Sequence, residues 1–255
     1  MLDSNRNVNL ASKEHSLRSY YQTLYAVWGP QHWWPARTRF EVVVGAYLTQ
    51  NTSWSNVEIA MRRLRQAHVL SMAGIRKISL TDLEGLIHSS GYFRQKAARL
   101  KTFVAFVDER YAGSLRHMFA QPTHKLRQEL LALDGVGPET ADSILLYAGQ
   151  RPVFVVDAYT RRILERHAIL PANAPYEEIR ELFERSLADQ TPLRTNKSDP
   201  RPGFAHAPSA MSLARRSPLA QVYNDMHGLI VGVGKHYCLK SKPRCEECPL
   251  RRFLP

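Results

Sequence analysis

Hydrophobic residues recur along most of the chain at the spacing of an α-helix, three or four positions apart. Segments with this period cover residues 40–48, 57–64, 100–107, 126–133, 141–148, 179–183 and 219–230. No segment shows the convincing alternation of apolar and polar residues that indicates a half-buried strand. The pattern predicts an all-α protein.

A short turn separates two of these segments, and its residues 133–137 read LDGVG. Two glycines one residue apart let backbone amides point outward together, and such a nest beside a helix N-terminus binds phosphate. Pro138 suits the first turn of the following helix, and Glu139 suits its positive end. The residues of this turn expected to contact phosphate, and DNA if the partner is DNA, are Leu133, Gly135, Val136, Gly137 and Thr140.

Charge and composition narrow the class of partner. The chain holds 35 Lys and Arg against 23 Asp and Glu, a formal charge of +12, which favours an anionic partner such as nucleic acid. The longest apolar runs are too short to cross a bilayer, and the first residues lack a signal-peptide core. We therefore expect a soluble cytoplasmic protein, associated with the nucleoid if its partner is DNA.

Asp157 follows the phosphate-binding turn along the chain, in the sequence Val155-Val156-Asp157-Ala158. Phosphates would repel a carboxylate, so its presence is better explained by chemistry on a transition state that carries positive charge. The alternative is an N-cap for a helix that begins near Ala158, because aspartate is common there. One side chain can serve in both ways.

Residues 193–217 differ from the rest of the chain. They are rich in Pro, Ser, Arg, Ala and Gly, and show no periodicity. This composition predicts a mobile surface loop without regular structure.

The segment 126–165 resembles the helix-hairpin-helix and following aspartate of the endonuclease III superfamily of DNA glycosylases, and the likeness extends over residues 30–190 and 217–250. The resemblance implies two helical domains with an active cleft between them. One comprises residues 36–157, and the other comprises 1–35 and 158–255. It also implies that Asp157 stabilises the sugar cation and helps water to attack it.

Two segments are candidates for filling the gap that an everted nucleotide leaves in DNA. By resemblance, Gln50 enters the DNA at the vacated site, with Asn51 beside it. Tyr92 lies where the family has a second wedge. The alternatives are a polar turn with a helix cap at Asn51 or Thr52, and ordinary packing of the Tyr92 ring.

Glu139 bears on the type of reaction. Family members that also cleave the DNA backbone use a lysine two residues after the hairpin to form a Schiff base, and this chain has Glu139 there. A carboxylate cannot form an imine, and nothing singles out Lys96, Lys101 or Lys125 as a substitute. We therefore expect a monofunctional glycosylase that leaves an abasic site.

Aromatic residues suggest the damaged base. Trp33, Trp34 and Pro35 precede the first core helix and Trp54 follows the wedge segment, as in the endonuclease III-like 3-methyladenine DNA glycosylases, which also carry Glu at position 139. Stacking and cation–π attraction favour a methylated, positively charged purine. The expected base pocket is Trp33, Trp34, Pro35, Trp54 and Glu139. The alternative is that the paired tryptophans are packing residues.

Cys238, Cys245 and Cys248 reproduce three of the four cysteines of the superfamily's [4Fe-4S] motif, and Leu254 occupies the fourth position. A cluster here needs another ligand, such as His236 or a group from outside the chain. A zinc site and a metal-free loop are the alternatives. His68, His88, His124 and His167 show no metal or triad spacing and are interpreted as structural or surface residues.

These expectations combine into a monomeric base-excision-repair glycosylase that removes alkylated purines, foremost 3-methyladenine, from damaged double-stranded DNA. Two alternatives are a related glycosylase for an oxidised pyrimidine or a mismatched base, and a non-enzymatic helix-hairpin-helix DNA-binding protein. Asp157 separates the last from the others, because a pure binding protein has no use for it.

Overall fold

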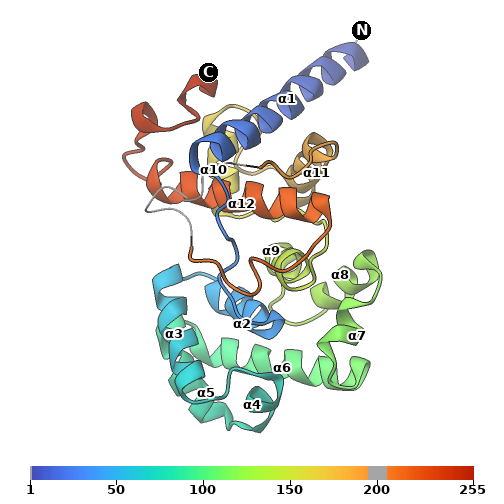
Figure 1. Cartoon of the computed structure of the whole chain (residues 1–255), viewed down its shortest axis with the longest axis vertical. Coiled ribbons are helices and arrows are strands. Elements are labelled where there is room, and N and C mark those ends of the chain that lie inside the picture. The colour runs from blue at the N-terminus through green and yellow to red at the C-terminus, as the bar shows by residue number, and fades with distance from the viewer. Residues whose placement is uncertain (1, 195–205) are drawn as a thin grey trace. The chain divides into compact units, whose positions relative to one another are not determined.

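The computed structural model of the protein describes residues 2–194 and 206–255, with side chains from residue 10 onward. Within these ranges the chain is helical and contains no strand, which confirms the predicted all-α class (Figure 1). The α-helices are α1 (Leu2–Trp28), α2 (Arg39–Thr49), α3 (Trp54–Gln66), α4 (Met72–Lys77), α5 (Leu80–Ile87), α6 (Phe93–Tyr111), α7 (Leu115–Phe119), α8 (Thr123–Leu131), α9 (Pro138–Ser143), α10 (Ala158–Arg166), α11 (Tyr176–Leu187) and α12 (Pro218–His236).

The chain forms two compact units. One is Ala36–Gly149, and the other combines Met1–Pro35 with Gln150–Pro255. The division after Pro35 coincides with the predicted start of the central domain, whereas the predicted end at residue 157 lies beyond the division after Gly149. Asp157 therefore belongs to the second unit, and the hairpin belongs to the first.

In the unit Ala36–Gly149, α2 is the central helix. Its residues from Phe40 to Leu48 are all buried, because α3, α6, α9 and the π-helical turn Ile144–Ala148 pack around it. Thr38 caps its N-terminus by accepting a hydrogen bond from the Glu41 amide at 3.1 Å. Glu41 also forms a 3.0 Å ion pair with Arg65 of α3, which fixes the start of α2 against its neighbour.

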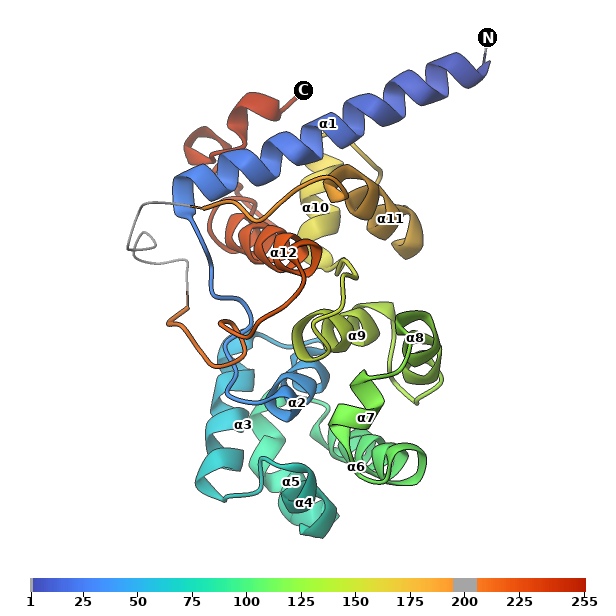
Figure 2. The same cartoon turned by 45° about the vertical axis from the view of Figure 1, so that its right-hand side comes forward.

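In the other unit, α12 is the buried helix, and α1, α10 and α11 pack against it (Figure 2). Two of its glycines make close packing possible. A Cβ at Gly234 would lie 2.3 Å from the Tyr159 ring of α10, and one at Gly228 would lie 3.1 Å from Trp33. The absence of a side chain at these positions brings α10 and the segment before α2 directly onto α12.

The predicted loop 193–217 is only partly within the described residues. Residues 206–217 contain a turn but no helix or strand, and several of them contact the rest of the unit although half are exposed. The His206 amide donates to the Gln31 carbonyl at 3.2 Å, the Ser209 hydroxyl donates to the Trp34 carbonyl at 3.3 Å, and Met211 is 7% exposed. Composition did not indicate these contacts.

None of the described helices combines the length and the hydropathy that crossing a bilayer requires.

Candidate active site

The predicted hairpin is present in the unit Ala36–Gly149, where α8 and α9 are joined by residues 132–137. Gly135 has a φ of +70°, a left-handed conformation that favours glycine, and a Cβ there would overlap the Arg99 side chain at 1.9 Å. The amides of Gly135 and Gly137 donate to no other group in the described part of the chain. They are therefore available to an external acceptor, as a phosphate-binding turn requires.

Gln50 lies against this hairpin. Its side-chain amide donates to the Gly135 carbonyl and to the Thr140 hydroxyl, both at 2.9 Å. These bonds connect the end of α2 to both sides of the glycine turn. Insertion of Gln50 into DNA would require both of them to break, a constraint that sequence reasoning did not foresee. Asn51 follows with a φ of +53° and is exposed, and the N-cap of α3 is Ser53 rather than Asn51 or Thr52.

Tyr92 is presented quite differently. It precedes α6 with a φ of +45°, and it is 66% exposed, the largest exposed fraction among the big hydrophobic side chains of the described residues. Packing, the alternative interpretation of this ring, is not observed. Leaving a large aromatic side chain in water is unfavourable, which makes Tyr92 the better-placed wedge candidate of the two.

Lys96 joins the segments that carry these two residues. The residue is 1% exposed, and its ammonium group donates to the Leu48 carbonyl at 2.9 Å and to the Ser90 carbonyl at 2.7 Å. Burial, with a smaller contribution from Arg99, lowers the pKa of Lys96 to about 8. The sequence indicated no role for this lysine, whose position becomes clear only from the packing of α6 on α2.

Asp157 is the N-cap of α10 in the other unit, as one of the two interpretations predicted. Its Oδ1 accepts hydrogen bonds from the Thr160 amide at 2.7 Å and the Thr160 hydroxyl at 2.9 Å. The carboxylate is 13% exposed, and its Oδ2 lies 3.7 Å from Nε2 of His227. One oxygen is thus fixed by the cap while the other faces a histidine.

His227, on α12, was missed by sequence reasoning. The residue is 4% exposed, and burial lowers its pKa although the charge of Asp157 opposes that shift, so the imidazole is neutral at neutral pH. Nearby Tyr159 has its pKa raised by burial and then by Asp157. Two neighbours of the carboxylate, His227 and Tyr159, are thus neutral, and the cationic Arg162 lies against the Tyr159 ring. His227 falls within the helical pattern of residues 219–230, but no sequence signal pairs it with Asp157.

The predicted base-pocket tryptophans are largely enclosed. Trp33 and Trp34 are 7% and 6% exposed, and the Trp33 ring lies 5.2 Å from the His206 ring and 5.6 Å from Nζ of Lys235. Trp54 is partly exposed and donates to Glu58 at 2.9 Å, and Glu139 is exposed on α9. This burial agrees with the packing alternative for the tryptophan pair.

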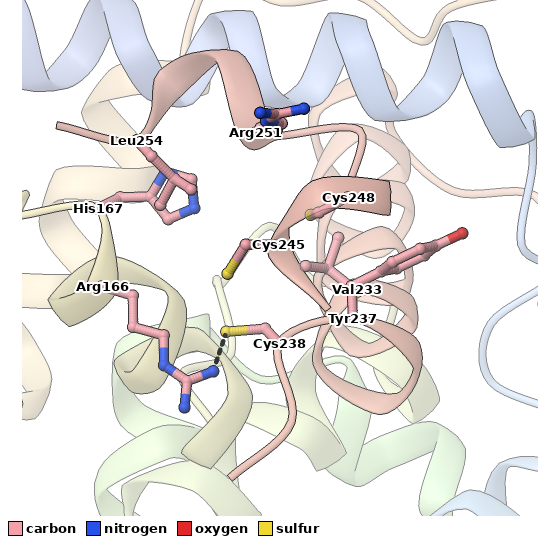
Figure 3. A pocket seen from close by; sticks show the side chains of 9 residues that line it. All are labelled: Arg166, His167, Val233, Tyr237, Cys238, Cys245, Cys248, Arg251 and Leu254. Atoms are coloured by element: carbon pink, nitrogen blue, oxygen red, sulfur yellow. Dashed lines mark hydrogen bonds between the residues drawn. The ribbon is translucent and has the colours of Figure 1, made fainter. Parts of the chain in front are cut away.

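The three cysteines line one small cavity of about 20 Å³ beside the end of α12 (Figure 3). Its other lining residues are Arg166, His167, Val233, Tyr237, Arg251 and Leu254. His236, the ligand that the sequence suggested, does not line it. Among the described residues, no group of three or more His, Cys, Asp or Glu side chains is arranged to hold a metal ion as the structure stands.

Known proteins share this architecture. The sequence profile of the HhH-GPD superfamily of base excision DNA repair proteins matches residues 44–189. A Methanocaldococcus jannaschii protein, named "Putative DNA repair glycosylase MJ1434", is 39% identical over 244 residues that cover 95% of this chain and 97% of that protein. The chain belongs to the HhH-GPD superfamily. It is a DNA N-glycosylase of the endonuclease III family, as the hairpin and Asp157 predicted.

Further relatives agree. Endonuclease III of Thermotoga maritima is 26% identical, over 83% of this chain and 80% of its own length. The structure of the H. pylori 3-methyladenine DNA glycosylase MagIII, bound to 1,N6-ethenoadenine, superposes with a TM-score of 0.70 at 26% identity, covering 88% of this chain and 97% of that one. A trapped endonuclease III–DNA covalent intermediate, at a TM-score of 0.71 and 19% identity over 94% of this chain and 95% of that one, shares the fold.

Proposed function

We propose that this HhH-GPD protein is a monofunctional DNA glycosylase that hydrolyses the N-glycosidic bond of alkylated purines, foremost 3-methyladenine, in double-stranded DNA. The observation that carries the proposal is the state of Asp157. Its carboxylate is fixed by the cap and 13% exposed. Because an oriented charge in a poorly solvated place stabilises a developing cation well, this carboxylate suits the sugar cation that forms as the base departs.

The cap itself supports a catalytic role. Thr160 holds Oδ1 through two hydrogen bonds, so the carboxylate cannot rotate freely, and Oδ2 is the oxygen left for a water or for the sugar. The positive end of α10 attracts negative charge at this position. Asp157 would thus stabilise the cation and accept a proton from the attacking water, and free base and an abasic site are the products.

Two residues support the proposal that the reaction has no lyase step. Glu139 stands where lyase members carry lysine, and a carboxylate cannot form a Schiff base. Lys96 has a lowered pKa, which would favour a nucleophile, but its amine is buried and donates to two backbone carbonyls. It is therefore engaged in structure rather than accessible to a sugar.

The choice of base rests on the similarity of this chain to MagIII, which is 26% identical in sequence. The MagIII structure contains bound 1,N6-ethenoadenine. The buried Trp33 and Trp34 give no separate support, whereas Trp54 is partly exposed. An endonuclease III-type lesion is the second candidate because of the Thermotoga maritima relative, although Glu139 argues against oxidised pyrimidines.

Base release identifies both activity and lesion. Purified protein is incubated with methylated genomic DNA, and the liberated bases are identified by mass spectrometry. We expect 3-methyladenine and no cut DNA strand, and borohydride should trap no covalent complex with abasic DNA. Release of oxidised pyrimidines alone, from oxidised DNA in parallel, would contradict the substrate, and efficient trapping would contradict the monofunctional assignment.

A further inference from the structure

The donor set at the cysteine cavity contains three thiols and one imidazole. Cys238 lies just after α12, Cys245 and Cys248 bound a short 3-10 turn, and His167 faces the same space from the end of α10 (Figure 3). Leu254, at the position of the family's fourth cysteine, cannot bind metal. Three thiolates and a histidine nitrogen together make four ligands, the number that a cubane cluster takes.

No other residue around the cavity can complete the set. Arg166 and Arg251 are cationic and Val233 is aliphatic, so none of these can bind metal. The hydroxyl of Tyr237 points away from the cysteines (Figure 3). Imidazole nitrogen does replace thiolate in natural iron–sulfur centres of the Rieske type. His167 is therefore the chemically suitable fourth donor.

The second nitrogen of His167 is held as the outer nitrogen of a ligand should be. Nδ1 lies 3.3 Å from the Phe253 carbonyl oxygen and 2.8 Å from the Tyr20 hydroxyl. In the tautomer with the proton on Nδ1, the ring donates to the Phe253 carbonyl and the lone pair lies on Nε2; in the other tautomer the Tyr20 hydroxyl donates to Nδ1. Metal-binding histidines usually donate their other N–H to such a group.

The ring of His167 is also fixed by packing. The Tyr20 ring lies edge-on to it at 5.2 Å and contacts the Phe253 ring at 5.0 Å, and Tyr20 is itself 1% exposed. This clamp involves α1, α10 and the C-terminal turn. Tyr20 and Phe253 thus fix the imidazole at the edge of the cavity that the three cysteines line.

We propose that His167 is the fourth ligand of a [4Fe-4S] cluster whose other ligands are Cys238, Cys245 and Cys248. The four donors line one cavity, and the three cysteines have the spacing of the family's cluster motif, which favours a cluster over a single zinc ion. Arg166 Nη1 lies 3.3 Å from Cys238 Sγ, where an N–H can donate to a thiolate ligand.

The cavity has to widen before it can hold a [4Fe-4S] cluster. Its volume of about 20 Å³ is on the order of one water molecule, so the segment with Cys245 and Cys248 has to move outward. The ion pairs Arg244–Glu247 and Arg251–Glu246 lie within this segment and would move with it. The cluster would hold the C-terminal segment to α10 and α12, and it has no part in the glycosylase chemistry.

The test is anaerobic reconstitution of the full chain with iron and sulfide. We expect about four irons per wild-type chain, a brown colour, and nitrogen coupling to the reduced cluster in pulsed EPR. His167→Ala should lose at least one iron and all nitrogen coupling. The matched control is His236→Ala, which removes a histidine at the end of α12 that does not line the cavity and should leave iron content and spectra unchanged.

A rescue variant distinguishes the loss of a cluster ligand from misfolding of the chain. His167→Ala combined with Leu254→Cys restores four cysteines, and we expect about four irons without nitrogen coupling. The proposal would be overturned by a wild-type cluster without nitrogen coupling, by a His167→Ala protein with the wild-type iron content and spectrum, by stoichiometric zinc in place of iron, or by a wild-type chain that takes up no metal. These readouts do not depend on base release, so they stand apart from the proposed function.

Discussion

The glycine turn around Gly135 and the carboxylate of Asp157 differ in how their surroundings hold them. The turn, in the unit Ala36–Gly149, presents backbone amides that donate to no other described group, and the nearby α6 starts from the exposed Tyr92. Asp157, in the other unit, is 13% exposed and held by Thr160. Groups that grip a phosphate backbone must be open to it, whereas a group that stabilises a transient charge works best when it is oriented beforehand.

The largest expected effect comes from Asp157→Asn. Asparagine caps a helix about as well as aspartate, so stability should change little, whereas loss of the charge should slow base release by about 10²–10⁴-fold. Single-turnover release of 3-methyladenine measures the rate, and thermal unfolding checks the fold.

Asp157→Ala sharpens the distinction between catalysis and capping. It removes both functions, so it should match the asparagine variant in rate but lose about 1 kcal/mol of stability as well. Wild-type turnover by the asparagine variant would mean that Asp157 is only a cap.

On the binding side, Gly135→Ala should weaken DNA affinity roughly tenfold and lower stability by about 1–2 kcal/mol, because alanine is strained at a φ of +70°. Its Cβ would also displace Arg99. Fluorescence anisotropy with duplex DNA measures the affinity.

Gly137→Ala is the matched control. A Cβ at Gly137 meets no atom within 4 Å and its φ is −88°, so alanine there should cost only the poorer N-cap of α9, about 0.5–1 kcal/mol and less than Gly135→Ala. Equal stability losses in the two variants would contradict the claim that the left-handed conformation of Gly135 makes alanine unfavourable there.

Tyr92 and Gln50 can be separated by stability and affinity together. Tyr92→Ala should cost about 1–3 kcal/mol in binding to lesion-containing DNA with little change in stability, because the ring is exposed. Gln50→Ala should weaken binding to lesion DNA more than to intact duplex, and also lower stability, since two hydrogen bonds to the hairpin are lost.

Titrations against intact duplex and lesion duplex, with chemical denaturation of each variant, measure these effects. Equal affinity losses for both duplexes would remove the wedge role from the residue concerned.

The smallest effect concerns Lys96 and pH. Burial lowers its pKa from 10.5 to about 8 in the folded protein, so the unfolded chain binds more protons between these values and stability contributed by this group rises with pH across that window. The stability that Lys96 contributes is lost as the pH falls through about 8.

Lys96→Met should abolish this contribution. Unfolding free energies of both proteins between pH 7.5 and roughly 9.5 show it as a difference in slope, and identical slopes would contradict the assignment. The upper limit of the pH range lies below the ordinary pKa of tyrosine. Above that pKa, the raised pKa values of four buried tyrosines would decrease the stability of both proteins; these are Tyr20, Tyr21, Tyr47 and Tyr223.

Local patterns predicted the parts of this molecule that depend on local rules. The helical period marked the long helices, and the glycine spacing marked the hairpin because a left-handed turn restricts residue choice. The cap at Asp157 follows from the residue type alone.

Features that depend on tertiary packing escaped prediction. Three examples are the hydrogen bonds from Gln50 to the hairpin, the position of His227 beside Asp157, and the burial of Trp33. Each depends on contacts between residues that are far apart in the chain. The same holds for His167 at the cysteine cavity, because helix packing rather than motif spacing brings it there.

The central claim is that Asp157 recognises positive charge on the sugar. The most direct measurement compares the affinity of the protein for DNA containing a cationic azasugar, which mimics that charge, with its affinity for DNA containing a neutral tetrahydrofuran site. We expect the wild type to prefer the cationic site by at least about 10²-fold and Asp157→Asn to lose most of that preference. An equal preference in both proteins would contradict the account.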